Sequence, residues 1–194
     1  MKKNLIFIGM PAVGKSTVGI VVAKRLGMRF IDTDLLIQEQ EGKLLREIIA
    51  EKGEEGFLEI ENQVNASVKA SNSVISPGGS VIYCQEAMKH YKKIGTIVYL
   101  KASYQTIKRR IKNPKKRGVV LKEGQSLRDL YYERVPYFEK YADITICEDG
   151  CRIEDTIKNV LNAVKKYRKT AQKRTEKRTE FRKKLDNTPK SKLK

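Results

Sequence analysis

The sequence has few cysteines, one histidine and no long apolar run, and each shortage excludes a class of protein. Cys84, Cys147 and Cys151 are odd in number and lack the spacing of a disulfide framework or a second pair of metal ligands. His90 lies in a polar helical stretch, so we expect it at the surface and without a general-base role. No segment reaches the ~18 apolar residues of a membrane span.

The residues that are present are dominated by positive charge, which is concentrated at the C-terminus. Residues 165–194 carry 14 lysines and arginines and 3 acidic residues, a net charge of +11 out of +18 for the chain. This segment, which includes the repeat KRTEKRTE, has too few apolar residues to fold alone, so we expect a frayed helix and then disorder. It is either a solvated extension or a weak electrostatic handle for RNA, acidic lipids or an acidic protein.

The segment Gly9–Thr17, GMPAVGKST, fits the phosphate-binding pattern of glycine, four residues, glycine, lysine and serine or threonine. An apolar run at residues 5–8 precedes it and a helical pattern at residues 18–26 follows, the strand–loop–helix context that the pattern requires. The alternative is a chance match in an ordinary strand–turn–helix. We predict a nucleotide-phosphate site at Gly9, Ala12, Val13, Gly14, Lys15, Ser16 and Thr17, with Lys15 at the outer phosphates and Ser16 on Mg²⁺.

The beginning of the chain, MKKNLIFIGMPAV, imitates a signal peptide, but the phosphate loop accounts for the same residues better. We therefore expect a cytoplasmic protein. The hydrophobic content of 40% is enough for one core, and 194 residues are most simply one domain with a tail.

Strand patterns alternate with helical patterns along the chain, which predicts an α/β fold with a parallel sheet between two helical layers. The expected strands are residues 5–8, 30–32, 73–76, 96–100 and 143–147. The expected helices are residues 18–26, 35–40, 44–52, 54–70, 85–93, 103–112, 126–142 and 153–169. Ligands of such sheets bind at the carboxyl ends of the strands.

Two carboxylates, Asp32 and Asp34, follow the second expected strand and are spaced to face the same way. One would help to hold Mg²⁺ and the other would address a substrate hydroxyl, which is most of what phosphoryl transfer requires. The simpler reading is that Asp34 is the N-cap of the next helix, and this is compatible with catalysis.

Three further features fall near strand ends. Gly78 and Gly79 suggest close approach of the backbone to a ligand, or else a simple turn. Residues 113–118, NPKKRG, suit a mobile lid over phosphates. Arg134 brings a guanidinium near the last strand, where it could pair with a substrate carboxylate.

These pieces, in this order, resemble the shikimate kinase family over about residues 5–147. The matching stretches are GMPAVGKST, AKRLGMRFIDTD, EIIAEKGEEGFLEIE, SPGGSV, TIVYLKAS, RRIKNPKKRG and ERVPYFEKYAD. The resemblance implies a P-loop fold like that of the nucleoside monophosphate kinases, with five parallel strands in a three-layer sandwich. It also implies transfer of the γ-phosphoryl group of ATP to the 3-hydroxyl of shikimate.

The resemblance also implies a role for individual residues. Lys15 would contact phosphates, Ser16 and Asp32 would bind Mg²⁺, and Asp34 would hold the acceptor hydroxyls. Arg110 would pack on adenine and Arg117 in the lid would stabilise charge during transfer. Gly78, Gly79 and Arg134 would complete the acceptor site, with Arg134 on the carboxylate.

The sequence departs from the family pattern in three places. Leu58 stands where the family usually has an arginine that binds the acceptor carboxylate, and Glu61 is left without that cation. Ser80 replaces a third glycine, and Gly118 replaces the proline after the lid arginine. Shikimate remains the expected acceptor, with Arg134 acting alone or with Arg46 as a substitute.

Two other functions remain open: a kinase for another small hydroxylated acid or polyol, and a non-catalytic nucleotide-binding protein whose basic tail binds RNA. We expect a kinase domain at residues 1–168, with an acceptor-binding helical insert at about 34–70 and a lid at about 112–124. Residues 169–194 would form the basic tail, the only segment expected to contact nucleic acid or an acidic partner. The expected form is a monomer.

Overall fold

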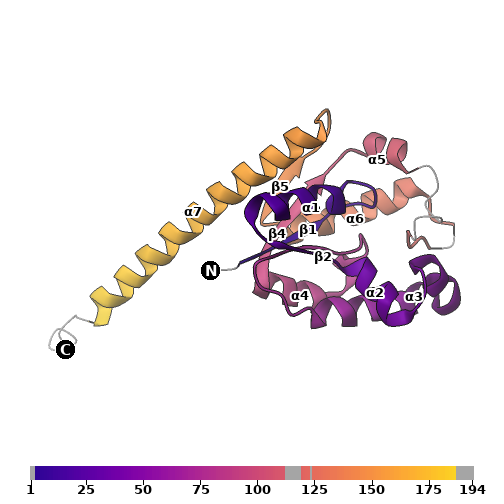
Figure 1. The fold of residues 1–194 in the computed structure, drawn as a ribbon, viewed down its shortest axis with the longest axis horizontal. Helices are drawn as coiled ribbons and strands as arrows, with labels where there is room; N and C mark the ends of the chain where they lie inside the picture. The colour runs from indigo at the N-terminus through magenta and orange to yellow at the C-terminus, as the bar shows by residue number, and fades with distance from the viewer. Residues whose placement is uncertain (1–2, 112–118, 123, 187–194) are drawn as a thin grey trace.

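Five parallel strands form one sheet in the order β2–β3–β1–β4–β5 (Figure 1). The computed structural model describes residues 3–111, 119–122 and 124–186. The strands are β1 (Asn4–Ile8), β2 (Arg29–Asp32), β3 (Ser73–Ser76), β4 (Gly95–Lys101) and β5 (Ile144–Cys147). All four strand pairings are parallel, so the five predicted strands and their parallel arrangement are confirmed.

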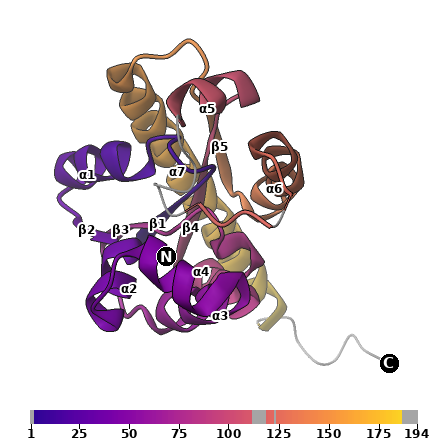
Figure 2. The ribbon, with the colours of Figure 1, turned by 90° about the vertical axis from the view of Figure 1, so that its right-hand side faces the viewer.

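Helices cover both faces of the sheet. They are α1 (Lys15–Leu26), α2 (Thr33–Glu41), α3 (Leu45–Ser67), α4 (Gln85–Ile94), α5 (Tyr104–Arg110), α6 (Leu127–Tyr141) and α7 (Ile153–Asp186), with a short 3₁₀ helix η1 (Val81–Tyr83). Figure 2 shows α1 and α7 on one side of the sheet and α4 and α6 on the other. This is the predicted three-layer sandwich.

The core is continuous because the central strands are buried on both faces. Every residue of β1 is buried, as are the first six of β4. Such unbroken apolar burial is typical of parallel strands that lie between two helical layers. Tyr99 of β4 stacks on Phe138 of α6 with ring centroids 5.1 Å apart, which fixes α6 against the sheet.

The helical insert between β2 and β3 contains one kink, at Gly53, and one buried polar side chain, Asn65, that forms hydrogen bonds. The two helices predicted at residues 44–52 and 54–70 are both present: they form the two parts of α3, which are separated by a kink at Gly53, where φ is 71°. The side chain of Asn65 accepts a hydrogen bond from Thr33 Oγ1 at 2.8 Å and donates one to the carbonyl of Glu61 at 2.6 Å. These buried bonds hold α3 in a fixed position against α2.

The last helix continues into the basic tail. We expected a core helix over residues 153–169 and a frayed helix continuing from it, and α7 runs to Asp186. Its first half packs on α1 and β5, and its C-terminal half extends away from the sandwich (Figure 1). The apolar residues Val160 and Val164 are buried at this packed end.

The cysteines are not cross-linked, and the single histidine contacts the backbone. Cys84 is buried, Cys151 is partly buried and Cys147 is exposed, and all three are free thiols. No cluster of three or more metal-binding side chains occurs among residues whose positions are described. His90 is partly buried rather than exposed, and its Nε2 lies 2.8 Å from the carbonyl oxygen of Val68. No helix in the described ranges is long and apolar enough to cross a membrane.

Candidate nucleotide and acceptor site

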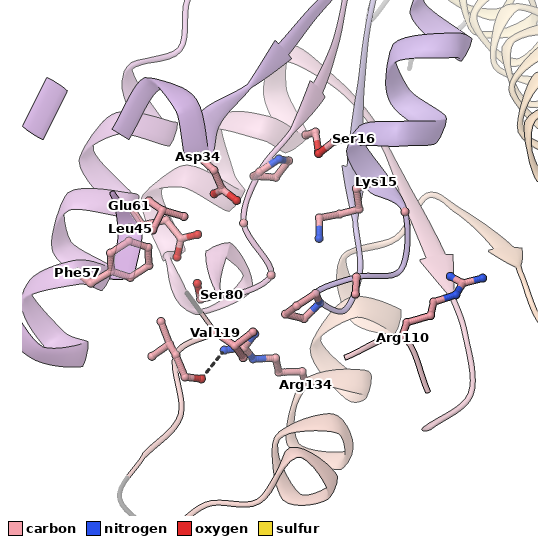
Figure 3. A pocket seen from close by; sticks show the side chains of 18 of the residues that line it. Lys15, Ser16, Asp34, Leu45, Phe57, Glu61, Ser80, Arg110, Val119 and Arg134 are labelled. Atoms are coloured by element: carbon pink, nitrogen blue, oxygen red, sulfur yellow. Dashed lines mark hydrogen bonds between the residues drawn. The ribbon is translucent and has the colours of Figure 1, made fainter. Parts of the chain in front are cut away.

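A cavity of about 510 Å³ opens at the carboxyl ends of β1, β2 and β3. Figure 3 shows Asp34 and Glu61 on one side of it, Lys15 on the other, and the guanidinium of Arg134 at the bottom of the view, below Ser80. Open parallel sheets bind ligands at this edge, because loops leave neighbouring strands there in diverging directions. The cavity therefore has the position and the charged lining of a ligand site.

The phosphate loop leaves β1 in a conformation that only small residues tolerate. Gly9 has φ 150°, and a Cβ there would lie 2.6 Å from the carbonyl oxygen of Leu100. Gly14 has φ 111° and Ala12 has φ 61°, so positive φ recurs along the loop. Loops of this kind turn successive backbone N–H groups toward one point, where an anion binds.

Some of the predicted loop residues line the cavity, and the others stabilise the loop from the side that faces away from it. Ala12, Gly14, Lys15, Ser16 and Thr17 line the cavity. The other two hold the loop from behind, since Gly9 packs against Leu100 and the carbonyl of Val13 accepts a hydrogen bond from Arg110.

Lys15 lies across the loop that precedes it. Its Nζ donates to the carbonyl oxygens of Gly9 at 3.1 Å and Met10 at 3.4 Å. Burial lowers the pKa of Lys15, and the nearby carboxylate of Asp34 acts in the opposite direction. An anion in the cavity would also favour the charged lysine, so the position suits a phosphate ligand.

Three oxygen-bearing side chains meet where the predicted metal site should be. Ser16 Oγ donates to Asp32 Oδ2 at 2.7 Å and lies 3.2 Å from Ser76 Oγ. Asp32 and Ser76 are brought together because they are paired in register on β2 and β3. Hydroxyl and carboxylate oxygens are the ligands that Mg²⁺ takes from proteins, so these residues fit that ion.

Asp32 also begins the helix that carries Asp34. Its Oδ1 accepts a hydrogen bond from the backbone N–H of Asp34 at 3.1 Å, so the N-cap is Asp32 and not Asp34. Asp34 is thereby free to line the cavity, where its Oδ1 has no hydrogen-bond partner among the described atoms. Burial raises the pKa of Asp34 to about 6, a trend that Lys15 opposes and Asp32 reinforces.

Gly78 separates Asp34 from a second buried carboxyl group, that of Glu61. A Cβ on Gly78 would lie 2.9 Å from Asp34 Oδ1 and closer still to Glu61 Oε1. Glu61 has no exposed surface, and burial raises its pKa to about 7. Glycine at position 78 is therefore required by the closeness of these two carboxyl groups, which the sequence pattern at residues 78–79 did not reveal.

Arg134 lines the cavity beside Gly79 and is almost completely buried, at 1% exposure. Its Nη2 donates to the carbonyl oxygen of Val120 at 3.3 Å, and its guanidinium lies 5.4 Å from the ring centroid of Tyr83. A Cβ on Gly79 would come within 3.2 Å of Arg134 Nη1. The guanidinium is therefore fixed in place and faces the cavity without a carboxylate partner in the described chain.

Arg110, at the end of α5, is held by two groups that the sequence did not connect to it. Its Nη1 donates to the carbonyl oxygen of Val13 at 2.8 Å and to Glu148 Oε2 at 2.9 Å. Glu148 is 4% exposed, and burial raises its pKa against the opposing influence of Arg110. Arg117, the predicted lid arginine, lies outside the described residues.

Several cavity residues were not identified from the sequence. Ser76 stands directly before Pro77 and Gly78, and its position at the end of a strand was the available signal. Glu148, which binds the cavity residue Arg110 and does not itself line the cavity, follows the last strand in the same way. The apolar members gave no signal, because a residue of the helical insert or of a loop looks like any core residue: these are Pro11, Leu45, Phe57, Val119 and Val120.

The structure also gives the positions of Leu58, which replaces the arginine that the family usually has, and of Arg46, which was considered as its substitute. Leu58 is partly buried and packs against the main core. Arg46 is exposed and its Nη2 lies 3.6 Å from Glu47 Oε1, and it is not among the residues that line the cavity. The described arrangement does not bring Arg46 to the acceptor side as a substitute.

Comparison with known proteins agrees with this geometry. Residues 11–165 match the family model for shikimate kinase. A shikimate kinase from Sulfurihydrogenibium sp. (strain YO3AOP1) is 33% identical over 165 residues, which cover 84% of this chain and 99% of that protein. Human Threonine synthase-like 1 is 38% identical over 168 residues, which cover 85% of this chain and 23% of that protein.

Among solved structures, a shikimate kinase from Acinetobacter baumannii in complex with shikimate superposes with a TM-score of 0.75. That protein is 29% identical, and the match covers 84% of this chain and 92% of the other. Sequence and fold therefore place the chain among the same relatives.

Proposed function

The chain belongs to the shikimate kinase family, a family of phosphotransferases with an alcohol acceptor, and from this we propose that it phosphorylates a hydroxyl group of a small hydroxy acid. Shikimate is the first candidate acceptor and ATP with Mg²⁺ is the donor. The observation that carries the proposal is a single cavity that joins a phosphate loop to Asp34 and Arg134.

On the nucleotide side, the loop N–H groups and Lys15 would hold the phosphates, and Arg110 would lie against the base. Ser16 and Asp32 would hold Mg²⁺, with Ser76 near enough to orient Ser16. When bound, the ion neutralises charge on the phosphates. Arg117 is proposed to add a cation over the transferring group.

On the acceptor side, Asp34 would accept a hydrogen bond from the reacting hydroxyl and take its proton. The hydroxyl oxygen forms a bond to the γ-phosphorus while the bond to the bridging oxygen of ADP breaks. A carboxylate whose pKa is raised to about 6 suits this task, because it is ionised near neutral pH and still a stronger base than an ordinary aspartate. Gly78 and Gly79 let the acceptor approach the backbone, and Arg134 would bind its carboxylate.

A coupled assay of ADP release with ATP, Mg²⁺ and shikimate tests the proposal. We expect saturable turnover and a phosphorylated product identified by mass spectrometry. In the matched control, Asp34→Asn, turnover should fall by about hundredfold or more while ADP still binds. Tight ATP binding without turnover of shikimate or any other hydroxy acid would contradict the proposed activity.

The domain limits follow from the same proposal. Residues 1–168 would form the kinase domain, with residues 34–70 as its acceptor-binding insert and residues 112–124 as its lid. Residues 169–194 would be a basic extension that is separate from the cavity. The projection of α7 away from the sandwich supports this separation (Figure 1).

A further inference from the structure

The cavity holds two buried side chains of opposite charge that have no partner in each other. Glu61 has no exposed surface and Arg134 has 1%, yet no ion pair within 4.0 Å joins either of them to a described residue. Glu61 Oε1 and Arg134 Nε have no hydrogen-bond partner in the described chain. Both residues line the cavity, Glu61 beside Gly78 and Arg134 beside Gly79 (Figure 3).

The surroundings of Glu61 compensate a negative charge only in part. A hydrogen bond from Ser80 and the charges of Arg134 and Lys15 lower its pKa, but burial, with the nearby Asp34, outweighs them. Its Oε2 also lies 3.9 Å from the thiol of Cys84, and Leu58, one helical turn earlier on α3, is apolar. Because no cation in the described part of the chain lies within ion-pair distance of this buried carboxylate, a cationic group of a ligand would stabilise its ionised form.

The space beside Glu61 is also bordered by a second unpartnered oxygen. Asp34 Oδ1 lacks a hydrogen bond, and it faces Glu61 Oε1 across the missing Cβ of Gly78. Two acceptor oxygens without a hydrogen bond among the described residues lie next to Gly78, while the guanidinium of Arg134, which has no carboxylate of those residues within 4.0 Å, lies beside Gly79. This arrangement complements a molecule that carries a positive and a negative group.

We propose that the cavity accepts small hydroxylated amino acids, with the ammonium group on the Glu61 wall, the carboxylate at Arg134 and the hydroxyl at Asp34. The proposal rests on the proposed phosphotransferase function and names a further class of acceptor for the same site. The transfer is unchanged: the hydroxyl oxygen takes the γ-phosphoryl group, ADP leaves and Asp34 takes the proton. Glu61 is a specificity-determining residue in this scheme.

The competing state of Glu61 is a neutral carboxyl group. Its pKa of about 7 means that both forms are populated near neutrality in the empty cavity. An ammonium group would hold Glu61 in the ionised form, whereas a neutral Glu61 would have no preference for an amino-bearing acceptor. The ionised and neutral states of Glu61 can therefore be distinguished by whether the protein prefers acceptors that carry an amino group.

Matched acceptor pairs that differ only in the amino group provide the test. L-homoserine is compared with 4-hydroxybutyrate, and L-serine with 3-hydroxypropionate, by calorimetric titration into protein loaded with MgADP. We expect the amino-bearing member of at least one pair to bind about tenfold tighter or more. This is the change in affinity that one hydrogen bond to a charged group contributes. With ATP, the same member should give phosphorylated product and ADP.

Two variants locate the preference. Glu61→Gln keeps the shape and removes the charge, so the preference should disappear. Glu59→Gln makes the same change at an exposed position of the same helix, so the preference should remain. Glu61→Asp keeps a carboxylate and should retain part of the preference, which gives a second test if the glutamine variant folds poorly.

The outcomes separate this inference from the proposed function. Equal binding within both pairs, or a preference that survives Glu61→Gln, would overturn the inference even if shikimate is turned over. A preference in binding that depends on Glu61 would support it. If no acceptor of any class were phosphorylated while that preference persisted, the proposed activity would fail and the ammonium site would stand.

Discussion

Ser16 Oγ and Asp32 Oδ2 are joined by a hydrogen bond of 2.7 Å, although they belong to α1 and β2. The bond brings the hydroxyl of the phosphate loop to the carboxylate at the end of the neighbouring strand. The two groups that would share Mg²⁺ are therefore already in contact, and a bound ion needs little rearrangement of either side chain.

Removing the charge of Asp32 should weaken the metal site without disturbing its shape. In Asp32→Asn the amide can still bond Ser16, but it binds a divalent ion poorly. We expect kcat to fall by about hundredfold and the Mg²⁺ concentration for half-maximal turnover to rise. A titration of ADP release against MgCl₂ measures both, and an unchanged Mg²⁺ dependence would remove Asp32 from the site.

Glu148 should act on the nucleotide through Arg110. Glu148 accepts a hydrogen bond from Arg110, which lies 38 residues earlier in the chain. The variant Glu148→Gln keeps an oxygen that can accept this bond, but it removes the negative charge that fixes the guanidinium. For a partly exposed ion pair of about 1 kcal/mol, we expect the KM for ATP to rise about fivefold. The KM of the acceptor should not change. Equal effects on both substrates would indicate a general loss of structure rather than positioning of Arg110.

Gly78 should be required for the acceptor and not for the nucleotide. A methyl group at this position would collide with Glu61 Oε1 and Asp34 Oδ1, and moving either carboxyl group misplaces the acceptor. For Gly78→Ala we expect kcat/KM for the acceptor to fall by about hundredfold. The affinity for ADP, measured by calorimetry, is the internal control. Normal acceptor kinetics would show that the two side chains can move apart at little cost.

A cation at position 58 should change acceptor selectivity. Residues 58 and 61 are three apart on α3, so an arginine at 58 can reach the carboxyl group of Glu61. For Leu58→Arg we expect the KM for shikimate to fall by about tenfold, because a new guanidinium would attract its carboxylate.

The preference of this variant for amino-bearing acceptors should decrease, since Glu61 would already be paired. Leu58→Met, which adds no charge, is the matched control and should behave like the parent protein. The idea fails if the arginine variant folds and binds ADP but shows the parent selectivity.

The buried charge of Glu61 should make stability depend on pH. The fold raises its pKa from the ordinary 4.5 to about 7, so the protonated form is favoured in the folded protein. The contribution of Glu61 is most favourable below about pH 4.5, and it is lost as pH rises through about 7. Glu61→Gln lacks this titration, so its unfolding free energy relative to the parent should increase by about 3 kcal/mol over that range.

Urea unfolding at about pH 5 and about pH 8 measures this difference. The titratable or charged groups that face Glu61 are present in both proteins, so the comparison isolates Glu61; they are Asp34, Lys15, Arg134, Cys84 and Tyr91. A difference in stability that is the same at both pH values would mean that Glu61 is not held in a perturbed state.

The fold was largely predictable because its signals are local. The apolar run of β1, the glycines of the loop and the helix that ends at Gly27 are contiguous in the chain, and each restricts backbone conformation by itself. The break at Gly53 was recognised together with the helices on both sides of it. The far end of α7 was expected only as a frayed continuation of the last core helix, because a charged repeat without an apolar face gives no packing signal.

The candidate site was predictable where its residues follow a strand. Lys15, Ser16, Asp32, Asp34, Gly78 and Gly79 all occupy such positions, and the structure brings them to one edge of the sheet. The partners of these residues were not predictable. Ser76 reaches Ser16 across 60 residues of sequence, and no pattern within either segment records that contact.

The sequence by itself determined the alternation of strands and helices, the phosphate loop and the order of the charged residues, since each depends on neighbours in the chain. Tertiary structure alone decided which charges are paired and which are buried without a partner. It joined Arg110 to Glu148, left Arg46 on the surface, and enclosed Glu61 and Arg134 in one cavity without an ion pair between them. The reason is physical: desolvation and ion pairing depend on groups that meet only when distant segments pack together.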